Sequence, residues 1–361
     1  MFDLHSLGFG PFFQEQLQHY PTNALVPARI AAEHRGGYEV WSSEGHGPAR
    51  LAGKLRHRLA GDSLPAAGDW VLLDVAKTSI IQHLLDRRTS FTRGAAGRAN
   101  RTQVVAANVD CVFVVCGLDE DYNLNRIERY LARIWASGAD PIVLLNKADL
   151  CADIIGHWDA VRRRAGGAPV YATSAIGGAV LPAGCSDLHA IAQAHVGWGR
   201  TVAFVGSSGA GKSTLINTLL GEARLATAAT RASDGRGCHT TTHRQLVLLP
   251  NGGLVLDTPG MRELELVDGE GLGAVFEDLE VLATGCRFGD CTHAHEPGCA
   301  VKRAVADGRL APERLEHYLK LRREAAAYER RHDEHLRRQS ERVWGQLHDE
   351  VARLRRWKGQ A

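Results

Sequence analysis

The feature that most constrains this chain is the order of its four nucleotide-binding motifs. Residues 146–149 (Asn-Lys-Ala-Asp) come first and residues 173–175 (Thr-Ser-Ala) follow. The glycine-rich run 206–213 comes next, and residues 257–260 (Asp-Thr-Pro-Gly) come last. In an ordinary GTP-binding domain the phosphate loop precedes the base-reading motif. Because that order is reversed here, the sequence predicts a circularly permuted α/β domain that binds GTP.

The glycine-rich run has the pattern of a phosphate loop in its required context. The apolar residues 201–205 predict a buried strand, and residues 214–220 predict a helix that Gly221 ends. Glycines allow backbone N–H groups to turn toward phosphates, and the helix N-terminus favours an anion. We expect Lys212 to reach the β and γ phosphates and Ser213 to ligate Mg²⁺. The predicted loop comprises Gly206, Ser207, Ser208, Gly209, Ala210, Gly211, Lys212, Ser213 and Thr214.

The base-reading motif follows an apolar run over 141–145, at the strand end where open α/β sheets bind ligands. A carboxylate at Asp149 can accept hydrogen bonds from guanine N1–H and from the guanine amino group. Adenine offers neither arrangement, so the sequence favours GTP over ATP. The residues expected to bind the base are Asn146, Lys147, Asp149, Ser174 and Ala175.

Asp257 ends a strand-like run and is placed to hold Mg²⁺, while the N–H of Gly260 is placed to sense the γ phosphate. The stretch 228–239 has no apolar period and predicts a mobile loop. Among the threonines that follow it, Thr241 or Thr242 is expected to complete the Mg²⁺ shell. The alternative is an exposed threonine-rich loop without a metal role.

Many GTPases carry a glutamine after the last motif to orient the attacking water, but here that position is Met261. A thioether cannot orient water, so His239 and His243 are the nearest candidates, although a loop histidine can also be merely solvated. The predicted catalytic set is Lys212, Thr241, His239 and His243. Slow turnover that a partner accelerates is the expectation.

Residues 286–299 bring three cysteines and two histidines close together in the sequence, among turn-forming glycines. We expect Cys286, Cys291, His293 and Cys299 to form a closed tetrahedral set for one structural Zn²⁺. His295 is a rival for the imidazole position. Disulfides are the competing interpretation, which the reducing cytosol and the absence of a signal peptide disfavour.

Short strand-like runs at 28–32, 38–41, 49–59 and 69–75 predict a small N-terminal β-barrel. Basic side chains alternate along the third run and would share a strand face suited to a phosphate backbone, or simply to solvent. These side chains are Lys54, Arg56 and Arg58. Further arginines follow in a glycine-containing linker that could also contact RNA. They are Arg87, Arg88, Arg93, Arg98 and Arg101.

After Cys299 the chain is expected to be mainly helical, and arginine pairs recur along it at 322–323, 330–331 and 337–338. Interleaved acids make a solvated helix an equally good interpretation. The net charge is +2, and no apolar run approaches the ~20 residues of a membrane span. We expect a soluble, cytoplasmic monomer. The predicted boundaries are an extension (1–23), the barrel (24–95), the permuted GTPase domain (96–268) and the zinc-binding domain with its helical tail (269–361).

The permuted motif order, the N-terminal barrel and the Cys-x4-Cys-x-His-x5-Cys pattern together resemble the RsgA (YjeQ) family of ribosome small-subunit-dependent GTPases, over nearly the whole chain. The resemblance implies a multidomain α/β protein with an OB-fold barrel, a permuted P-loop GTPase domain and a C-terminal helical zinc-binding domain. It also implies a late maturation factor of the small (30S) ribosomal subunit, whose GTP hydrolysis that subunit stimulates. The expected nucleotides are GTP and GDP. Because the barrel and the zinc-binding domain flank the permuted domain, we hypothesise that both bind ribosomal RNA in the GTP state and release it after hydrolysis. One departure is Cys238, where the family commonly has a basic residue.

Two other functions are compatible with parts of the sequence. A nucleotide-gated RNA-binding protein with little useful turnover would explain Met261. A zinc-dependent enzyme would explain the cysteine cluster, but three cysteines and one histidine fill all four positions and leave none open for catalysis.

Overall fold

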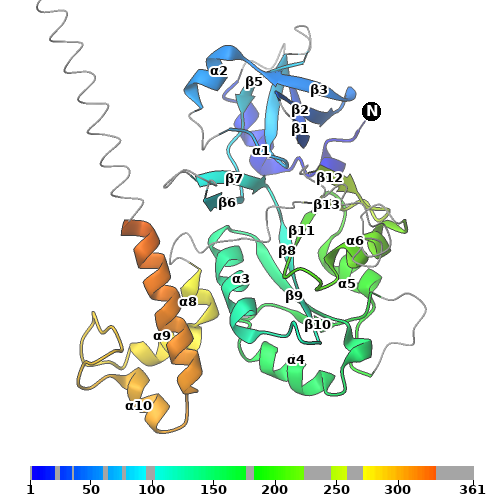
Figure 1. The fold of residues 1–361 in the computed structure, drawn as a ribbon. Helices are drawn as coiled ribbons and strands as arrows, with labels where there is room; N and C mark the ends of the chain where they lie inside the picture. The colour runs from blue at the N-terminus through cyan, green and yellow to red at the C-terminus, as the bar shows by residue number, and fades with distance from the viewer. Residues whose placement is uncertain are drawn as a thin grey trace, which may run out of the picture.

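The computed structural model describes residues 2–20, 25–34, 36–59, 64–74, 79–94, 102–175, 183–222, 245–257 and 271–330 (Figure 1). The chain begins with a 3-10 turn, η1 (His5–Leu7), and helix α1 (Pro11–Leu17). Phe9 and Phe13 from this segment pack against Trp70 of the first domain. The predicted N-terminal extension therefore lies against the domain that follows it.

The first domain is a closed five-stranded barrel. Its strands are β1 (Val26–His34), β2 (Gly37–Ser42), β3 (Gly45–Leu51), β4 (Trp70–Asp74) and β5 (Ile80–Leu84). The strand order is β1-β2-β3-β5-β4, and pairing of β4 with β1 closes the ring. Alternate side chains such as Ile30, Val40 and Val71 fill the interior. The barrel prediction is confirmed, and this strand order fits the small Greek-key barrel of an OB-fold.

The third predicted strand is wrong over its second half. Strand β3 ends at Leu51, and residues Gly53–Arg58 form a helix, α2. Leu55 is the buried member of this helix and belongs to the barrel core. At 100° per residue, Lys54 and Arg58 lie on one side of the helix while Arg56 points elsewhere. These basic residues therefore do not share a strand face. The prediction was wrong because a single buried leucine is compatible with a helix turn as well as with a strand.

The predicted linker after the barrel is also wrong in part. Residues Ser90–Gly94 (β6) and Thr102–Ala107 (β7) pair as an antiparallel ribbon. Arg87 forms two hydrogen bonds to the buried carboxylate of Asp69, at 2.8 and 2.7 Å. Arg88 pairs with Asp110. Arg87 and Arg88 therefore form ion pairs within the protein. Arg98 and Arg101 lie outside the described residues.

The second domain is built on a parallel sheet. Its strands are β8 (Cys111–Gly117), β9 (Asp140–Asn146), β10 (Val170–Ala172), β11 (Thr201–Val205), β12 (Gln245–Leu248) and β13 (Leu254–Asp257). The order is β10-β9-β8-β11-β13-β12, and only β12 runs antiparallel to its neighbour in this series. A pairing of Ala32 with Gln245 joins β12 to the barrel sheet.

Helices cover both faces of the parallel sheet (Figure 1). They are α3 (Leu124–Ala136), α4 (Ile154–Arg162), α5 (Leu188–His195) and α6 (Lys212–Leu220). Val112 and Val114 of β8 pack in one core with residues of α3 and α4. Phe113 and Val115 of the same strand pack in a second core with residues of α5 and α6. This alternation follows from the two-residue period of a strand that is buried on both faces.

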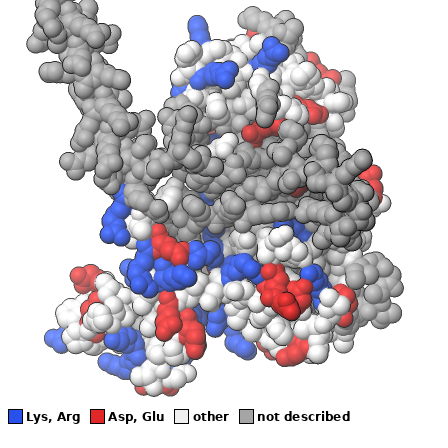
Figure 2. Space-filling model, in the orientation of Figure 1, with Lys and Arg blue, Asp and Glu red and all other residues white. Residues whose placement is uncertain are grey.

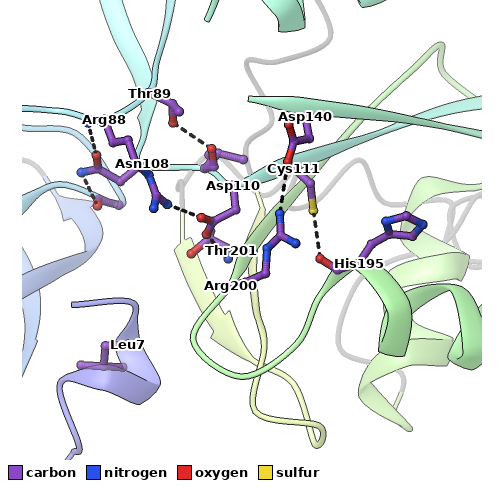
Figure 3. Close-up of polar contacts among 12 residues, drawn as sticks. Leu7, Arg88, Thr89, Asn108, Asp110, Cys111, Asp140, His195, Arg200 and Thr201 are labelled. Carbon is purple, nitrogen blue, oxygen red and sulfur yellow. Dashed lines mark hydrogen bonds and ion pairs between the residues drawn. The ribbon is translucent and has the colours of Figure 1, made fainter. Parts of the chain in front are cut away.

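A polar network fixes the junction between the barrel and the parallel sheet (Figure 3). Asn108 accepts a hydrogen bond from the Arg88 N–H at 2.9 Å and donates one to the Gly68 carbonyl at 3.1 Å. The backbone N–H of Thr201 donates to Asp110 at 2.7 Å. Arg29, which is fully buried in the barrel, donates to the Asn108 carbonyl at 2.9 Å. The two domains are therefore joined by hydrogen bonds between groups from both sides of the junction.

The C-terminal unit consists of helices α8 (Leu272–Val275), α9 (Glu277–Ala283) and α10 (Ala300–Ala306) and a last helix over 312–330. It packs on α3 of the second domain (Figure 1). At the contact, a Cβ on Gly271 would lie 1.7 Å from the Ala132 carbonyl oxygen, so the two backbones touch directly. No helix within the described ranges is long and apolar enough to cross a membrane.

Candidate nucleotide and metal sites

The motifs that the sequence separates meet at one edge of the parallel sheet. Asn146 is the last residue of β9, and Thr173 directly follows β10. Gly206 directly follows β11, and Asp257 is the last residue of β13. Because these four strands run parallel, their carboxyl ends share one edge, where open α/β sheets bind ligands. The motif order in the sequence is permuted, but the arrangement in space is that of a nucleotide site.

Glycine is required at two positions of the phosphate loop. Gly206 has a φ of 141°, and a Cβ there would lie 2.2 Å from the Val115 carbonyl oxygen. Gly211 has a φ of 98°, and its Cβ would lie 2.2 Å from Nδ2 of Asn146. That same Nδ2 donates to the Ala210 carbonyl at 2.9 Å. The base-reading motif thus contacts the phosphate loop directly and helps to set its shape.

The residues expected to read the base are held by short polar contacts. The hydroxyl of Ser174 donates to Asp149 at 2.5 Å, which joins two of the predicted motifs. Lys147 has a left-handed backbone (φ 62°) and pairs with Asp119 at 2.6 Å. Asn146 Oδ1 and Thr173 Oγ1 are buried and have no hydrogen-bond partner among the described residues. Buried polar atoms without partners are uncommon and mark places where a ligand can supply the missing bond.

Lys212, the first residue of α6, turns back onto its own loop. Its Nζ donates to the Gly206 carbonyl at 2.8 Å and also to the Ser207 carbonyl. Ser213 and Thr214 follow in the first turn of α6, and Asp257 is half-buried at the end of β13. The ammonium group therefore lies inside the loop whose N–H groups would surround phosphates. Thr241, His239, His243 and Gly260 lie outside the described residues.

An acidic segment after β8 belongs to the same edge, although none of the predicted motifs includes it. Asp119 pairs with Lys147, and this hydrogen bond is the main reason that the pKa of the Asp119 carboxyl is lowered. Asp121 accepts a hydrogen bond from the Ser207 hydroxyl of the phosphate loop. The sequence did carry a signal for this segment, because two carboxylates follow just after a buried parallel strand. Asn146 and Asp257 were predicted from the same position at a strand end.

A second candidate site lies in the C-terminal unit, where four ligand atoms meet. The ligand atoms of Cys286, Cys291, His293 and Cys299 all lie within 4.8 Å of one another. Cys286 Sγ is 3.9 Å from Cys299 Sγ and 3.7 Å from His293 Nδ1. His295 is exposed and lies outside the cluster. This arrangement could hold a metal ion.

Backbone N–H groups donate hydrogen bonds to two of the cluster's sulfurs. The N–H of Ala300 donates to Cys286 Sγ at 3.3 Å, and the N–H of Lys302 donates to Cys299 Sγ at 3.4 Å. Burial alone would raise the pKa of the Cys286 thiol, but hydrogen bonds from Ala300 and Val301 and from neighbouring thiols bring it below its ordinary value. The distance of 3.9 Å between the two sulfurs is far from that of a disulfide, which is about 2.0 Å. The cluster therefore has the chemistry of a metal site rather than that of a disulfide.

Comparison with known proteins agrees with this geometry. The family model described as RsgA GTPase matches residues 84–267. A small ribosomal subunit biogenesis GTPase RsgA from Opitutus terrae is 45% identical over 359 residues, which cover 96% of each chain. Its namesake from Xylella fastidiosa strain 9a5c is 47% identical and covers 82% of this chain and 85% of its own.

Two solved structures share the fold. YjeQ from Thermotoga maritima has a TM-score of 0.60 and 26% identity, and the match covers 84% of this chain and 99% of YjeQ. YloQ, described as a circularly permuted GTPase, has a TM-score of 0.58 and 25% identity, with coverage of 85% and 98%. The family match spans the edge where the nucleotide motifs converge, and the match to the Opitutus terrae relative covers 96% of the chain. This chain therefore belongs to the RsgA GTPase family.

Proposed function

We propose that this protein hydrolyses GTP and acts in the biogenesis of the small ribosomal subunit. The observation that carries the proposal is the convergence of the four permuted motifs at one sheet edge, with the phosphate loop and the guanine-reading motif in direct contact through Asn146 and Ala210. Relatives that share up to 47% identity bear the name of small ribosomal subunit biogenesis GTPases. Their name supplies the ribosomal part of the proposal.

Within this site, we assign guanine recognition to Asp149, held by Ser174, and to Asn146 and Lys147. The loop N–H groups and Lys212 bind the phosphates, so the Lys212 ammonium exchanges its loop carbonyls for phosphate oxygens when nucleotide enters. Ser213 and Asp257 fit a Mg²⁺ that accompanies the nucleotide, since a hydroxyl and a carboxylate are oxygen ligands of the kind this ion prefers. When bound, that ion neutralises phosphate charge.

The C-terminal cluster fits Zn²⁺ in a structural role. Tetrahedral coordination with bonds of about 2.3 Å to sulfur and about 2.0 Å to nitrogen separates two sulfurs by about 3.8 Å and a sulfur from a nitrogen by about 3.5 Å. The corresponding separations here are 3.9 Å between the sulfurs of Cys286 and Cys299, and 3.7 and 3.4 Å from these two sulfurs to His293 Nδ1. The ligand atom of Cys291 lies within 4.8 Å of the others. The four protein ligands fill the coordination shell. Metal analysis of the purified protein should find one zinc per chain, and Cys299→Ser should lose it.

The remaining assignments concern partners. We propose that the protein binds ribosomal RNA, as a monomer in the cytoplasm, where ribosomes are assembled. Support comes from the surface where α3 meets the 312–330 helix, over which Lys and Arg side chains gather with interleaved acids (Figure 2). Exposed cations of that helix include Lys320, Arg322, Arg323 and Arg330. Such a surface suits a phosphate backbone, although the acids limit its net charge.

The deciding experiment is GTP turnover measured with the protein alone, with purified small subunits and with large subunits as a control. Strong stimulation by small subunits alone is the expected result, and Lys212→Ala should abolish it. Binding without useful turnover under every condition would favour a nucleotide-gated RNA-binding protein instead. Equal stimulation by both subunits would contradict the proposed specificity.

A further inference from the structure

The phosphate loop has an anchor that lies outside every nucleotide-binding motif in the sequence. The Ser207 hydroxyl donates to Oδ2 of Asp121, in the segment between β8 and α3. The loop contains glycines with positive φ at positions 206, 209 and 211, so its backbone has little intrinsic preference for one shape. When Lys212 leaves the carbonyls of Gly206 and Ser207 for phosphate, the bond to Asp121 remains to hold this side of the loop.

This anchor creates an electrostatic problem. A carboxylate beside a loop that must accept a polyphosphate repels the ligand, and it repels GTP more than GDP because GTP carries an additional phosphate charge. Asn or Ser at position 121 could accept the same hydrogen bond without a charge. The carboxylate is therefore compatible with tight GTP binding only where a cation compensates it.

Arg126 supplies that cation from the first turn of α3. Its Nη2 lies 2.5 Å from Oδ1 of Asp121, on the carboxylate oxygen that Ser207 does not use, and it also donates to the Asp121 backbone carbonyl. The Arg126 N–H is itself capped by the Asn123 side chain at 3.0 Å, which fixes the start of the helix. The Arg126 side chain is 35% exposed and that of Asp121 18% exposed, so solvent and salt screen the pair only partly.

We propose that Asp121 is a positioning residue of the phosphate loop and that Arg126 is the counter-charge that tunes the relative affinity for GTP and GDP. This inference rests on the proposed function, because it takes residues 206–213 as the phosphate site. Asp121 acts through Ser207, and Arg126 acts through Asp121. The pair sets how strongly the loop discriminates between the two nucleotides, in addition to holding the shape of the loop.

The test is a titration of fluorescent GTP and GDP analogues against four variants at low and at high ionic strength. Asp121→Asn keeps an acceptor for Ser207 but removes the negative charge, so it should raise the ratio of GTP to GDP affinity about threefold. Arg126→Ala should lower that ratio about threefold. The double variant should return the ratio close to that of the wild type, and all these shifts should shrink in high salt. Ser207→Ala should weaken both nucleotides about tenfold and leave the ratio unchanged.

The chain offers a matched control in Asp140 and Arg200, an exposed pair 3.3 Å apart at the opposite edge of the parallel sheet (Figure 3). Asp140→Asn and Arg200→Ala make the same changes in net charge and should leave the ratio unaltered. A purely structural role for Asp121 predicts that its variants weaken both nucleotides equally. Ratios that do not move, or that move in the same direction for Asp121→Asn and Arg126→Ala, would overturn the inference. A wild-type protein that binds neither nucleotide would instead overturn the proposed function itself.

Discussion

At the residue scale, each carboxylate of the candidate nucleotide site has a defined partner. Asp149 is held by Ser174, Asp119 by Lys147 and Asp121 by Arg126. A side chain that a hydrogen bond already holds in place loses less conformational entropy when it binds a ligand. The same contacts make each carboxylate testable by a substitution that keeps its shape and removes its charge.

The clearest of these tests concerns guanine selectivity. Asp149→Asn replaces one carboxylate oxygen by an N–H donor and removes the charge. The hydrogen bond from the guanine amino group is then lost and the one from N1–H is weakened, so we expect GTP affinity to fall about a hundredfold. Xanthosine triphosphate, which replaces the amino group by a carbonyl, should regain affinity. Competition binding measures both effects. Asp153→Asn, an exposed helix cap nearby, is the control. Unchanged GTP selectivity in Asp149→Asn would show that other residues read the base.

The pair of Asp119 and Lys147 makes a prediction about pH. Asp119 has a lowered pKa in the folded protein, chiefly through its hydrogen bond to Lys147, relative to an ordinary value of 3.8. Its contribution to stability is therefore fully present above that ordinary value and is lost as the pH falls through the folded pKa. Because both side chains are about 30% exposed, the contribution should stay within about 1 kcal/mol.

Urea unfolding of wild type and Asp119→Asn across a pH series measures this contribution. We expect a constant difference in the free energy of unfolding from about pH 5 to pH 8, and a smaller difference in more acidic solution. A difference that instead grew on acidification would contradict the assignment.

At the element scale, helix α3 connects the nucleotide domain to the C-terminal unit. Glu128, on its buried side, is fully buried and lies 2.6 Å from Arg314 and 2.5 Å from His317 of the 312–330 helix. Arg314 also forms two hydrogen bonds to Asp278, which follows the first residue of α9. A single helix thus begins beside the phosphate loop and carries the docking site of the C-terminal unit. Helix α3 is therefore a direct structural link between the phosphate loop and the C-terminal unit.

Glu128 provides a test of this docking. Glu128→Gln keeps the size of the side chain but leaves the buried cation of Arg314 without its full counter-charge, and we expect a loss of about 3 kcal/mol of stability. Chemical unfolding gives the free energy, and limited proteolysis shows whether the C-terminal unit detaches first. Glu313→Gln, an exposed change on the partner helix, should have little effect. If the two variants were equally stable, the buried network would not hold the units together.

Two neighbouring glycines test the close approach between α8 and α3. Gly271→Ala would place a methyl group 1.7 Å from the Ala132 carbonyl oxygen, whereas a Cβ on Gly273 meets nothing within 4 Å. The first change should cost about 1–3 kcal/mol through overpacking. The second should be neutral or slightly stabilising, because alanine favours the helix. Thermal unfolding of the two single variants compares them, and equal melting temperatures would argue against the close contact.

At the scale of the whole molecule, two units flank the nucleotide-binding domain. The barrel is joined to the parallel sheet by the Asn108 network, and the C-terminal unit is joined to it by α3 (Figures 1 and 3). If both units contact the small subunit when GTP is bound, retention of the protein on small subunits should be greater with a non-hydrolysable GTP analogue than with GDP. Co-sedimentation measures retention, and equal amounts with both nucleotides would contradict release after hydrolysis.

Local patterns in the sequence were enough to predict the two candidate sites. A phosphate loop needs glycines and a lysine at fixed spacing between a strand and a helix. A metal cluster of this kind needs cysteines and a histidine close together in the sequence. Both patterns can therefore be recognised within a short segment. The alternation of Lys54, Arg56 and Arg58 led to a wrong prediction of a strand. A strand and a helix turn can each bury one leucine among polar neighbours. Only the packing of Leu55 in the barrel core distinguishes them.

Contacts between distant segments were decided by tertiary structure alone. Asp121 and Ser207 are 86 residues apart, and Glu128 and Arg314 are 186 residues apart. Nothing in the sequence around an acidic residue states which distant cation or hydroxyl will face it, because that depends on how strands are ordered and helices are packed. The sequence by itself determined the permuted GTPase motifs and the cysteine and histidine cluster. The fold alone decided that Asp121 would accept a hydrogen bond from the phosphate loop. It also decided that α3 would join the nucleotide domain to the C-terminal unit.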